Sequence, residues 1–368
     1  MLGNDGLGYR YGGSRSIPAR LFHVSDSDQA QYSIPPTRPG KSVADASTHN
    51  CKTPGPHTPV RSVAGAARRP RFSFRRRRKR EGGREMAGSV DLPVVDLASP
   101  DVRAAAASVR QACVEHGFFY VSNHGVDAAL LEALFAESRK FFEQPMEGKM
   151  ALQRGSNHRG YTPPYAEKLD AASKFEGDLK ESFYIGRDLN QWPSEERFPS
   201  WKDTMKQYWS SALAVGERIL SLIALSLDLD AEFFQKNGAL DCPTAFVRLL
   251  HYPGEVNEFD SGNYGASAHS DYGVITLLTT DGTPGLQICR EKDRHPQLWE
   301  DVPHIDGSTL HRVVAVGKER YSVAFFLDPN PDFVVRCFES CCSEANPPRF
   351  PPIRSADYLK ERLSATYK

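Results

Sequence analysis

Two residues that bind metals well stand two positions apart in the segment AHSDYGVITLL, residues 268–278. If this segment forms a strand, side chains at positions i and i+2 point to the same side of the sheet, so His269 and Asp271 project together. An imidazole beside a carboxylate also occurs often without a functional role, and the pair alone is a weak signal. It gains weight only if a third ligand joins it in the fold.

A second histidine, His311, stands beside another apolar run in the segment LHRVV. Two histidines and one carboxylate make up the facial triad of non-haem Fe(II) oxygenases, which leaves the remaining coordination positions of the metal open. Imidazole and carboxylate suit Fe(II), and the pattern offers no thiolate. His269, Asp271 and His311 are therefore candidates for such a triad.

An arginine and a serine follow in the apolar segment RYSVAFF, residues 320–326. Arg320 and Ser322 share one face of the expected strand, and a guanidinium fork with a hydroxyl is suited to a carboxylate. A surface salt bridge is the alternative interpretation of the arginine. Because an unpaired charge inside an apolar strand is costly, we favour a bound anion.

These residues follow a helical part of the chain. The spacing of apolar residues predicts a short strand over 92–97 and helices over 101–116, 127–142 and 203–227. Beyond the last helix, short apolar runs recur between Gly, Pro and Asp residues. Many short strands with turn signals indicate an all-β barrel or sandwich, so we expect helices first and a β core after them.

The charges divide the chain into two unlike parts. Residues 1–85 contain 17 Lys and Arg against 6 Asp and Glu, whereas residues 86–368 contain 29 against 40. The first part is rich in Gly, Pro, Ser and Arg and lacks apolar periodicity, so we expect it to be disordered. It resembles a plastid or other organelle transit peptide in composition, and its RRRRKR run fits a nuclear signal or nucleic-acid tail. We favour a third interpretation, in which translation begins at Met86.

The composition also limits the partners of the protein. Because the part after residue 85 is acidic, we do not expect nucleic acid as a partner. No apolar run approaches the length of a membrane span, so we expect a soluble protein without a membrane partner. We further expect a monomer in the cytoplasm, with nuclear or plastid targeting by residues 1–85 as the open alternatives.

The motifs HSD, LHRV and RYSVAFF together resemble the 2-oxoglutarate- and Fe(II)-dependent dioxygenases, specifically the plant-type, hyoscyamine 6-dioxygenase-like group. GFFYVSNHGV and RLLHYPG resemble two further segments of that family, so the likeness runs from Leu92 to the C-terminus. It implies a mainly β fold with helices, in which a double-stranded β-helix (jelly-roll) core packs against an N-terminal helical region. The implied regions are a disordered extension over 1–85, a helical region over 86–235, the Fe(II)/2-oxoglutarate domain over 236–335, and a tail with a helix over 336–368.

The resemblance also implies roles and a reaction. Iron would be bound by His269, Asp271 and His311, and 2-oxoglutarate by Arg320, Ser322 and Tyr252. The expected enzyme hydroxylates or desaturates a small-molecule metabolite of plant secondary metabolism with molecular oxygen, and it releases succinate and carbon dioxide. Ascorbate is the expected reductant. Residues 158–165 and Phe183–Tyr184 are candidates for the wall of the substrate site.

One core segment of the family is missing. WEDVPHIDG, residues 299–307, runs directly into STLHRV, where family members have a further strand and its turn. Loss of this strand leaves backbone groups of its neighbours unpaired and removes the element that leads into His311. A catalytically impaired isoform or pseudo-enzyme of the same family is therefore an alternative hypothesis. A nucleic-acid-directed protein acting through the basic N-terminus is a third and less favoured one.

Overall fold

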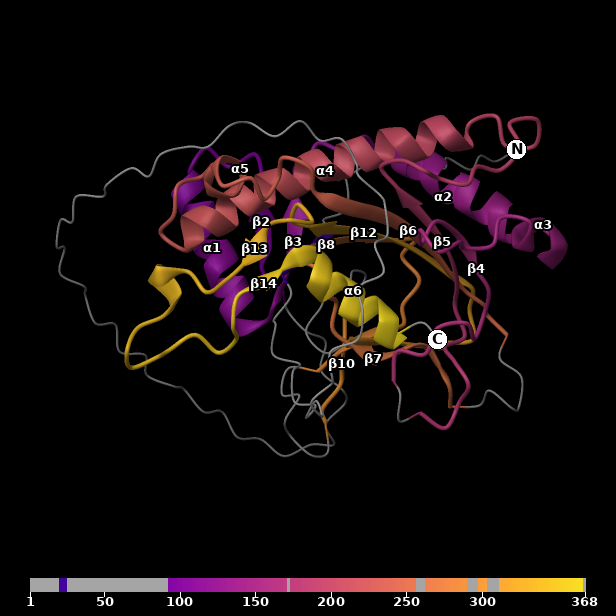
Figure 1. Ribbon diagram of the computed structural model, residues 1–368. Helices are drawn as coiled ribbons and strands as arrows, with labels where there is room; N and C mark the ends of the chain where they lie inside the picture. The colour runs from indigo at the N-terminus through magenta and orange to yellow at the C-terminus, as the bar shows by residue number, and fades with distance from the viewer. Residues whose placement is uncertain are drawn as a thin grey trace, which may run out of the picture. The chain divides into compact units, whose positions relative to one another are not determined.

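The computed structural model of the 368-residue chain describes residues 20–24, 92–170, 173–255, 262–289, 297–302 and 311–366. Two β-sheets face each other, and the helices labelled in Figure 1 flank them. In the described ranges, no helix is long and apolar enough to cross a membrane.

Within the described ranges the larger sheet contains eight strands, and the strand order mixes segments that lie far apart in the sequence. From one edge to the other, the order is β2 (Val94–Asp96), β3 (Phe118–Ser122), β1 (Arg20–Val24), β8 (Ile275–Thr280), β12 (Arg320–Asp328), β6 (Thr244–Tyr252), β5 (Glu181–Gly186) and β4 (Gly160–Thr162).

The smaller sheet, as far as the structure describes it, contains four strands and supplies the opposite wall of the β core. Its order is β10 (Glu300–Asp301), β9 (Leu286–Ile288), β11 (His311–Val314) and β7 (Tyr264–His269). A separate two-stranded ribbon near the C-terminus pairs β13 (Val334–Val335) with β14 (Ile353–Arg354).

The helices connect and cover these sheets. They are α1 (Val102–Glu115), α2 (Ala128–Phe142), α3 (Met146–Met150), α4 (Trp201–Ser226), α5 (Phe233–Lys236), the 3-10 helix η2 (Glu339–Cys341) and α6 (Ser355–Thr366). Asp101 caps α1 by accepting from the Ala104 amide at 2.9 Å, and Asp127 caps α2 in the same way from Ala129. The expected helices 101–116, 127–142 and 203–227 correspond to α1, α2 and α4.

The long helix α4 lies along the outer face of the larger sheet (Figure 1). It approaches β12 closely because residue 216 is glycine: a Cβ there would stand 2.7 Å from Leu327 Cδ2. Along β12 the side chains alternate, as the pleat of a strand requires. Val323, Phe325 and Leu327 belong to the core under α4, whereas the intervening residues line the space between the two sheets.

Two findings depart from the sequence expectations. We expected no element in residues 1–85, yet Arg20–Val24 form strand β1 within the larger sheet. We also expected His269 and Asp271 on one strand. His269 instead ends β7, and Asp271 lies in the connection to β8. The expectation failed because the apolar run 274–278 belongs to the next strand, β8, which lies in the opposite sheet.

Candidate metal centre and co-substrate pocket

Three side chains with metal-binding atoms converge at one end of the space between the sheets. His269, Asp271 and His311 each offer one ligand atom, and these atoms lie within 4.8 Å of one another. The centres of the imidazole rings of His269 and His311 are 4.1 Å apart, and His269 Nε2 lies 3.7 Å from Asp271 Oδ1. The structure therefore brings together the three residues that the sequence pattern singled out, although they come from β7, its following loop and β11.

Hydrogen bonding prepares His269 to act as a ligand. Its Nδ1 lies 2.7 Å from the Ser267 carbonyl oxygen and donates to it, which leaves the lone pair of Nε2 directed toward Asp271 and His311. Burial, together with the neighbouring His311, lowers the pKa of His269 to about 3. The imidazole is thus neutral at physiological pH, which is the form that binds a metal.

Asp271 is held by the strand that follows it. The Thr276 hydroxyl donates to Asp271 Oδ2 at 2.8 Å, which leaves Oδ1 on the side of the histidines. His311 is the first residue of β11 and is paired in register with His269 of β7. Backbone pairing of two neighbouring strands therefore sets the separation of the two imidazoles, and the loop supplies the carboxylate.

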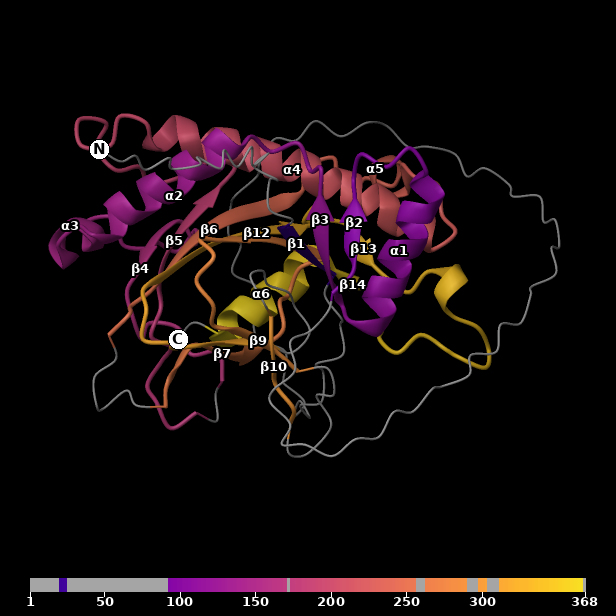
Figure 2. The ribbon, with the colours of Figure 1, turned by 180° about the vertical axis from the view of Figure 1, so that it is seen from behind.

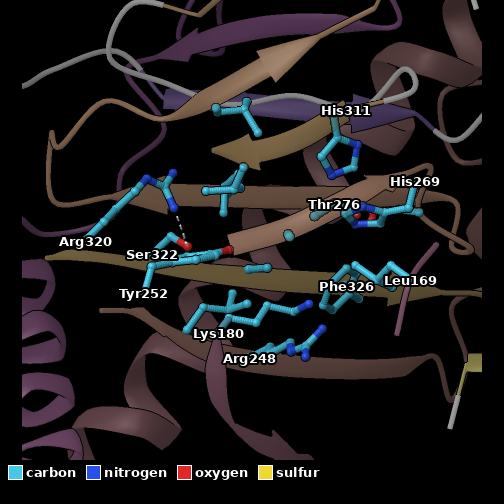
Figure 3. Close-up of a pocket in the computed structure, with 17 residues that line it drawn as sticks. Leu169, Lys180, Arg248, Tyr252, His269, Thr276, His311, Arg320, Ser322 and Phe326 are labelled. Atoms are coloured by element: carbon cyan, nitrogen blue, oxygen red, sulfur yellow. Dashed lines mark hydrogen bonds and ion pairs between the residues drawn. The ribbon is translucent and has the colours of Figure 1, made fainter. Parts of the chain in front are cut away.

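Arg320, Ser322 and Tyr252 gather at the other end of the same pocket (Figure 3). Arg320 is 2% exposed; its Nη1 donates to Ser322 Oγ at 3.2 Å, and its Nε donates to the Thr283 carbonyl oxygen at 3.2 Å. The guanidinium lies 5.0 Å from the centre of the Tyr252 ring, because Arg320 and Tyr252 are directly paired between β12 and β6. A buried cation thus faces the histidines across an elongated pocket with apolar walls, which include Leu250, Leu278 and Val313.

A buried ionic cluster, which the sequence analysis did not find, borders the pocket. Lys180 Nζ lies 2.7 Å from Glu167 Oε2 and 2.6 Å from Asp178 Oδ2, and Arg248 Nη2 lies 2.6 Å from Glu167 Oε2. Burial alone would raise the pKa of Glu167, but Arg248 and Lys180 hold it well below its usual range. Glu167 and Lys180 are therefore charged inside the protein, where the neighbouring charges compensate them.

This cluster reaches the metal centre through one serine. Asp178 Oδ1 accepts from the Ser267 amide at 3.1 Å and from its hydroxyl at 2.6 Å, and the Ser267 carbonyl in turn accepts from His269. The sequence contained a signal for it, because Arg248 stands in the apolar run AFVRLLHY just as Arg320 stands in RYSVAFF. The cost of an unpaired charge in such a strand applies equally to both arginines.

His251 lies between two carboxylates: its Nδ1 lies 2.7 Å from Glu181 Oε1, and its Nε2 lies 2.8 Å from Glu319 Oε1. Lys149 also contacts Glu181, at 2.8 Å. These groups join β6, β5 and α3 on the side of the sheet away from the pocket, so their role is structural.

A second cavity adjoins the triad on the side of the C-terminal helix. Its apolar lining comes from Leu169, Phe246, Phe326, Leu359 and Leu363. His158 and Tyr184, two of the expected wall residues, also line it, whereas Phe183 is fully buried in the core. Because His269, Asp271 and Phe326 line both cavities, the two spaces meet at the candidate metal centre.

Comparison with known proteins identifies the family. The "2OG-Fe(II) oxygenase superfamily" profile matches residues 243–329, and the profile "non-haem dioxygenase in morphine synthesis N-terminal" matches residues 92–209. Kihadalactone A synthase LFS of Citrus sinensis is 39% identical over 307 residues, which cover 74% of this chain and 91% of that protein. The chain belongs to the 2-oxoglutarate/Fe(II)-dependent oxygenases. Azadirone synthase LFS of Melia azedarach is 34% identical and covers 77% of this chain and 94% of its own length.

Solved structures of the same oxygenase family share the fold. A 2OG-Fe(II) oxygenase family protein from Caulobacter crescentus has a TM-score of 0.63 and 28% identity, covering 74% of this chain and 98% of that one. JOX2 in complex with 2OG, Fe and JA has a TM-score of 0.62 and 27% identity, covering 76% of this chain and 86% of that one. The jelly-roll core and the plant-type family membership expected from the sequence are thus confirmed.

The residues of this oxygenase fit the family's iron and 2-oxoglutarate. Two imidazoles and a carboxylate are the donors that suit Fe(II), and a buried arginine lies across the same pocket. When bound, the iron and its co-substrate supply the activation of oxygen and the oxidation of substrate, with succinate and carbon dioxide as co-products. The geometry gives no support to the catalytically impaired alternative, because His311 stands beside His269 despite the short connection before it.

Proposed function

We propose that this oxygenase hydroxylates or desaturates an apolar small molecule, and that six side chains divide the work. Iron is held by His269, Asp271 and His311, and the distal carboxylate of 2-oxoglutarate by Arg320, Ser322 and Tyr252. The single observation that carries this assignment is the arrangement of one elongated pocket, with three metal-binding atoms at one end and a buried guanidinium at the other.

The protein's own groups have separate tasks in this proposal. Ser267 and Thr276 orient His269 and Asp271 through the hydrogen bonds described above. The Arg320 guanidinium pairs with the carboxylate of the co-substrate and so aligns its other end with the metal. Leu250, Leu278 and Val313 exclude water from the space between the two ends.

The second cavity is the proposed substrate site. Its lining is mainly apolar, and the polar side chains His158 and Arg154 lie 3.4 Å apart within it. Burial, together with the nearby Arg154 and Arg159, lowers the pKa of His158, so its imidazole is neutral. This favours an uncharged apolar skeleton with an oxygen function that accepts a hydrogen bond. The plant relatives, whose names describe synthases of individual metabolites, support a small-molecule metabolite as the substrate.

The proposal extends to the setting of the enzyme. Ascorbate is proposed as the reductant that returns oxidised iron to Fe(II). We propose a monomer that acts in the cytoplasm without a nucleic-acid partner, in line with the acidic balance after residue 85. The divisions at residues 236 and 336 are likewise proposed, and the boundary at 236 falls at the end of α5.

Succinate formation tests the function. The full chain is incubated with Fe(II), ascorbate, oxygen and 2-oxoglutarate, with and without a panel of apolar plant metabolites, and succinate is measured by mass spectrometry. We expect a slow background rate that an accepted substrate increases and that His311→Ala abolishes. Succinate formation that is equal in the native chain and in His311→Ala contradicts the proposed function.

A further inference from the structure

Strand β1 occupies an interior position in the larger sheet, between β3 and β8, although it comes from the N-terminal extension (Figure 2). It pairs antiparallel with β3, where Leu21 is opposite Tyr120, and antiparallel with β8, where Leu21 is opposite Leu278. A five-residue segment thus has a backbone partner on each side. Strands with two partners are interior strands, whose removal divides a sheet.

Strand β8 depends on β1 for half of its backbone pairing. On one side it pairs with β12 over Ile275–Thr280, and on the other side β1 is its partner in the described part of the chain. Ile275 and Leu277 are 0% and 4% exposed, so this strand is buried. Buried N–H and C=O groups need partners, and without β1 one edge of β8 would have none in the described sheet.

The same strand attaches the N-terminal strands to the core. In the sheet order, β2 and β3 reach β8 only through β1. The connection that leads into His311 is short, because only residues 303–310 separate it from Val302. The alignment with the Citrus sinensis relative agrees with this. It spans 307 positions, which is more than 74% of the 368 residues of this chain, so the relative has residues at some aligned positions where this chain has none.

We propose that residues 20–24 replace a core strand that the shortened oxygenase domain does not supply itself, so that the N-terminal extension is a structural part of the enzyme. The site is the strand-wide gap between β3 and β8, and its occupant is this chain's own Arg20–Val24 segment. Main-chain pairing is the basis of the interaction, as when an extended peptide adds a strand to an open sheet edge. The proposal argues against a start of translation at Met86.

Two physical features favour this replacement. Phe22 and Val24 are of the residue types that strands prefer, within an extension that is otherwise rich in Gly, Pro, Ser and Arg. The connection over residues 25–91 is long, yet the entropic cost of closing a loop grows only with the logarithm of its length. Tethering also keeps the segment at a high effective concentration near its site.

The replacement strand β1 is linked to the metal centre through Thr276 of its neighbour β8. His23 of β1 is opposite Thr276 of β8, and the Thr276 hydroxyl holds Asp271 Oδ2 at 2.8 Å. Loss of β1 would leave β8 paired on one side only, at the position from which Asp271 is oriented. The extension would thereby support iron binding without contacting the iron.

Hydrogen–deuterium exchange of the native full chain tests the proposal first. Amides of residues 20–24 should exchange as slowly as those of β8, because both are interior strands of one sheet. Exchange of residues 20–24 at the rate of an unstructured peptide would overturn the proposal, whatever the catalytic activity of the chain.

A proline variant tests whether β1 is required. Phe22→Pro removes a backbone donor in the middle of β1, and the matched control Phe72→Pro places the same change elsewhere in the extension. We expect Phe22→Pro to reduce protection in β8 and β3 by roughly tenfold or more, and to weaken Fe(II) binding, with no such change in the control.

The outcomes of this comparison separate the two cases. If Phe22→Pro fails to fold while Phe72→Pro folds normally, the fold itself depends on β1. The control carries the same substitution outside β1, so the proline as such is not the cause. Unchanged protection of β8 in a folded Phe22→Pro variant would show that the sheet does not need β1 and would overturn the proposal.

Discussion

Replacement of Arg320 by lysine tests the co-substrate end of the pocket while keeping its charge. The guanidinium is 2% exposed and is fixed by Ser322 Oγ and the Thr283 carbonyl oxygen, both at 3.2 Å. A carboxylate in front of it can accept two parallel N–H donors, whereas an ammonium is a point charge without this planar fork. Arg320→Lys should therefore lose one charge-assisted hydrogen bond to 2-oxoglutarate.

The size of the effect follows from that single bond. A hydrogen bond to a charged group contributes about 1.5–3 kcal/mol, and 1.4 kcal/mol corresponds to a factor of ten in affinity. The dissociation constant of 2-oxoglutarate should therefore rise by roughly 10- to 100-fold in Arg320→Lys. The assay is a titration of the Fe(II)-loaded protein with 2-oxoglutarate without oxygen, followed by visible absorbance.

Arg312→Lys is the matched control. Arg312 lies on β11 of the smaller sheet and outside the pocket lining. It donates to Gln287 Oε1 at 2.8 Å and lies 3.9 Å from the centre of the Trp299 ring. It should leave the affinity for 2-oxoglutarate unchanged. An unchanged affinity in Arg320→Lys, or an equal loss in the Arg312→Lys control, would refute the assignment of Arg320 to the co-substrate.

Three further predictions address the surroundings of the site. Thr276→Val removes the hydrogen bond to Asp271 and should weaken Fe(II) binding by roughly 2- to 10-fold, because a typical hydrogen bond contributes about 0.5–1.5 kcal/mol. Thr280→Val is the control, and an equal Fe(II) affinity of the Thr276→Val variant and the native chain would contradict the role of Thr276. Burial would raise the pKa of Glu181, but hydrogen bonds from His251, Lys149 and Tyr161 lower it below the ordinary value. Its carboxylate therefore stabilises the fold above about pH 4.5, and this stabilisation is lost as the pH falls from there through the lowered pKa. Glu181→Gln should cost about 3 kcal/mol in urea unfolding at pH 7 and flatten the acid dependence, and an unaltered pH profile would contradict this. Tyr272→Phe removes the contact with Thr366 and should speed amide exchange in α6; identical exchange would show that this contact does not hold the helix.

The sequence predicted the site better than the route by which the chain builds it. His269, Asp271 and His311 stood out because two imidazoles and a carboxylate are the ligand set of the facial triad of non-haem Fe(II) oxygenases. Local patterns place residues on strands, but they do not show where one strand ends and the next begins in another sheet. The shared strand assigned to His269 and Asp271 was wrong for that reason.

Contacts between distant segments were beyond the sequence patterns. The Glu167–Lys180–Asp178–Arg248 cluster joins residues separated by up to 81 positions, and no periodicity links them. Strand β1 is the clearest case, because a short apolar run in a polar extension resembles many runs that never pair. Its place in the sheet depends on a gap that is created elsewhere, between β3 and β8.

Metal binding by the triad tests the central claim most directly. The full chain receives Fe(II) and 2-oxoglutarate without oxygen, and bound iron and the visible charge-transfer band are measured together. We predict one Fe(II) per chain with a band that is lost in His269→Ala and in Asp271→Ala and is kept in the control His116→Ala. A folded native chain that binds no iron, or a His269→Ala variant with the same iron affinity and band, would contradict it.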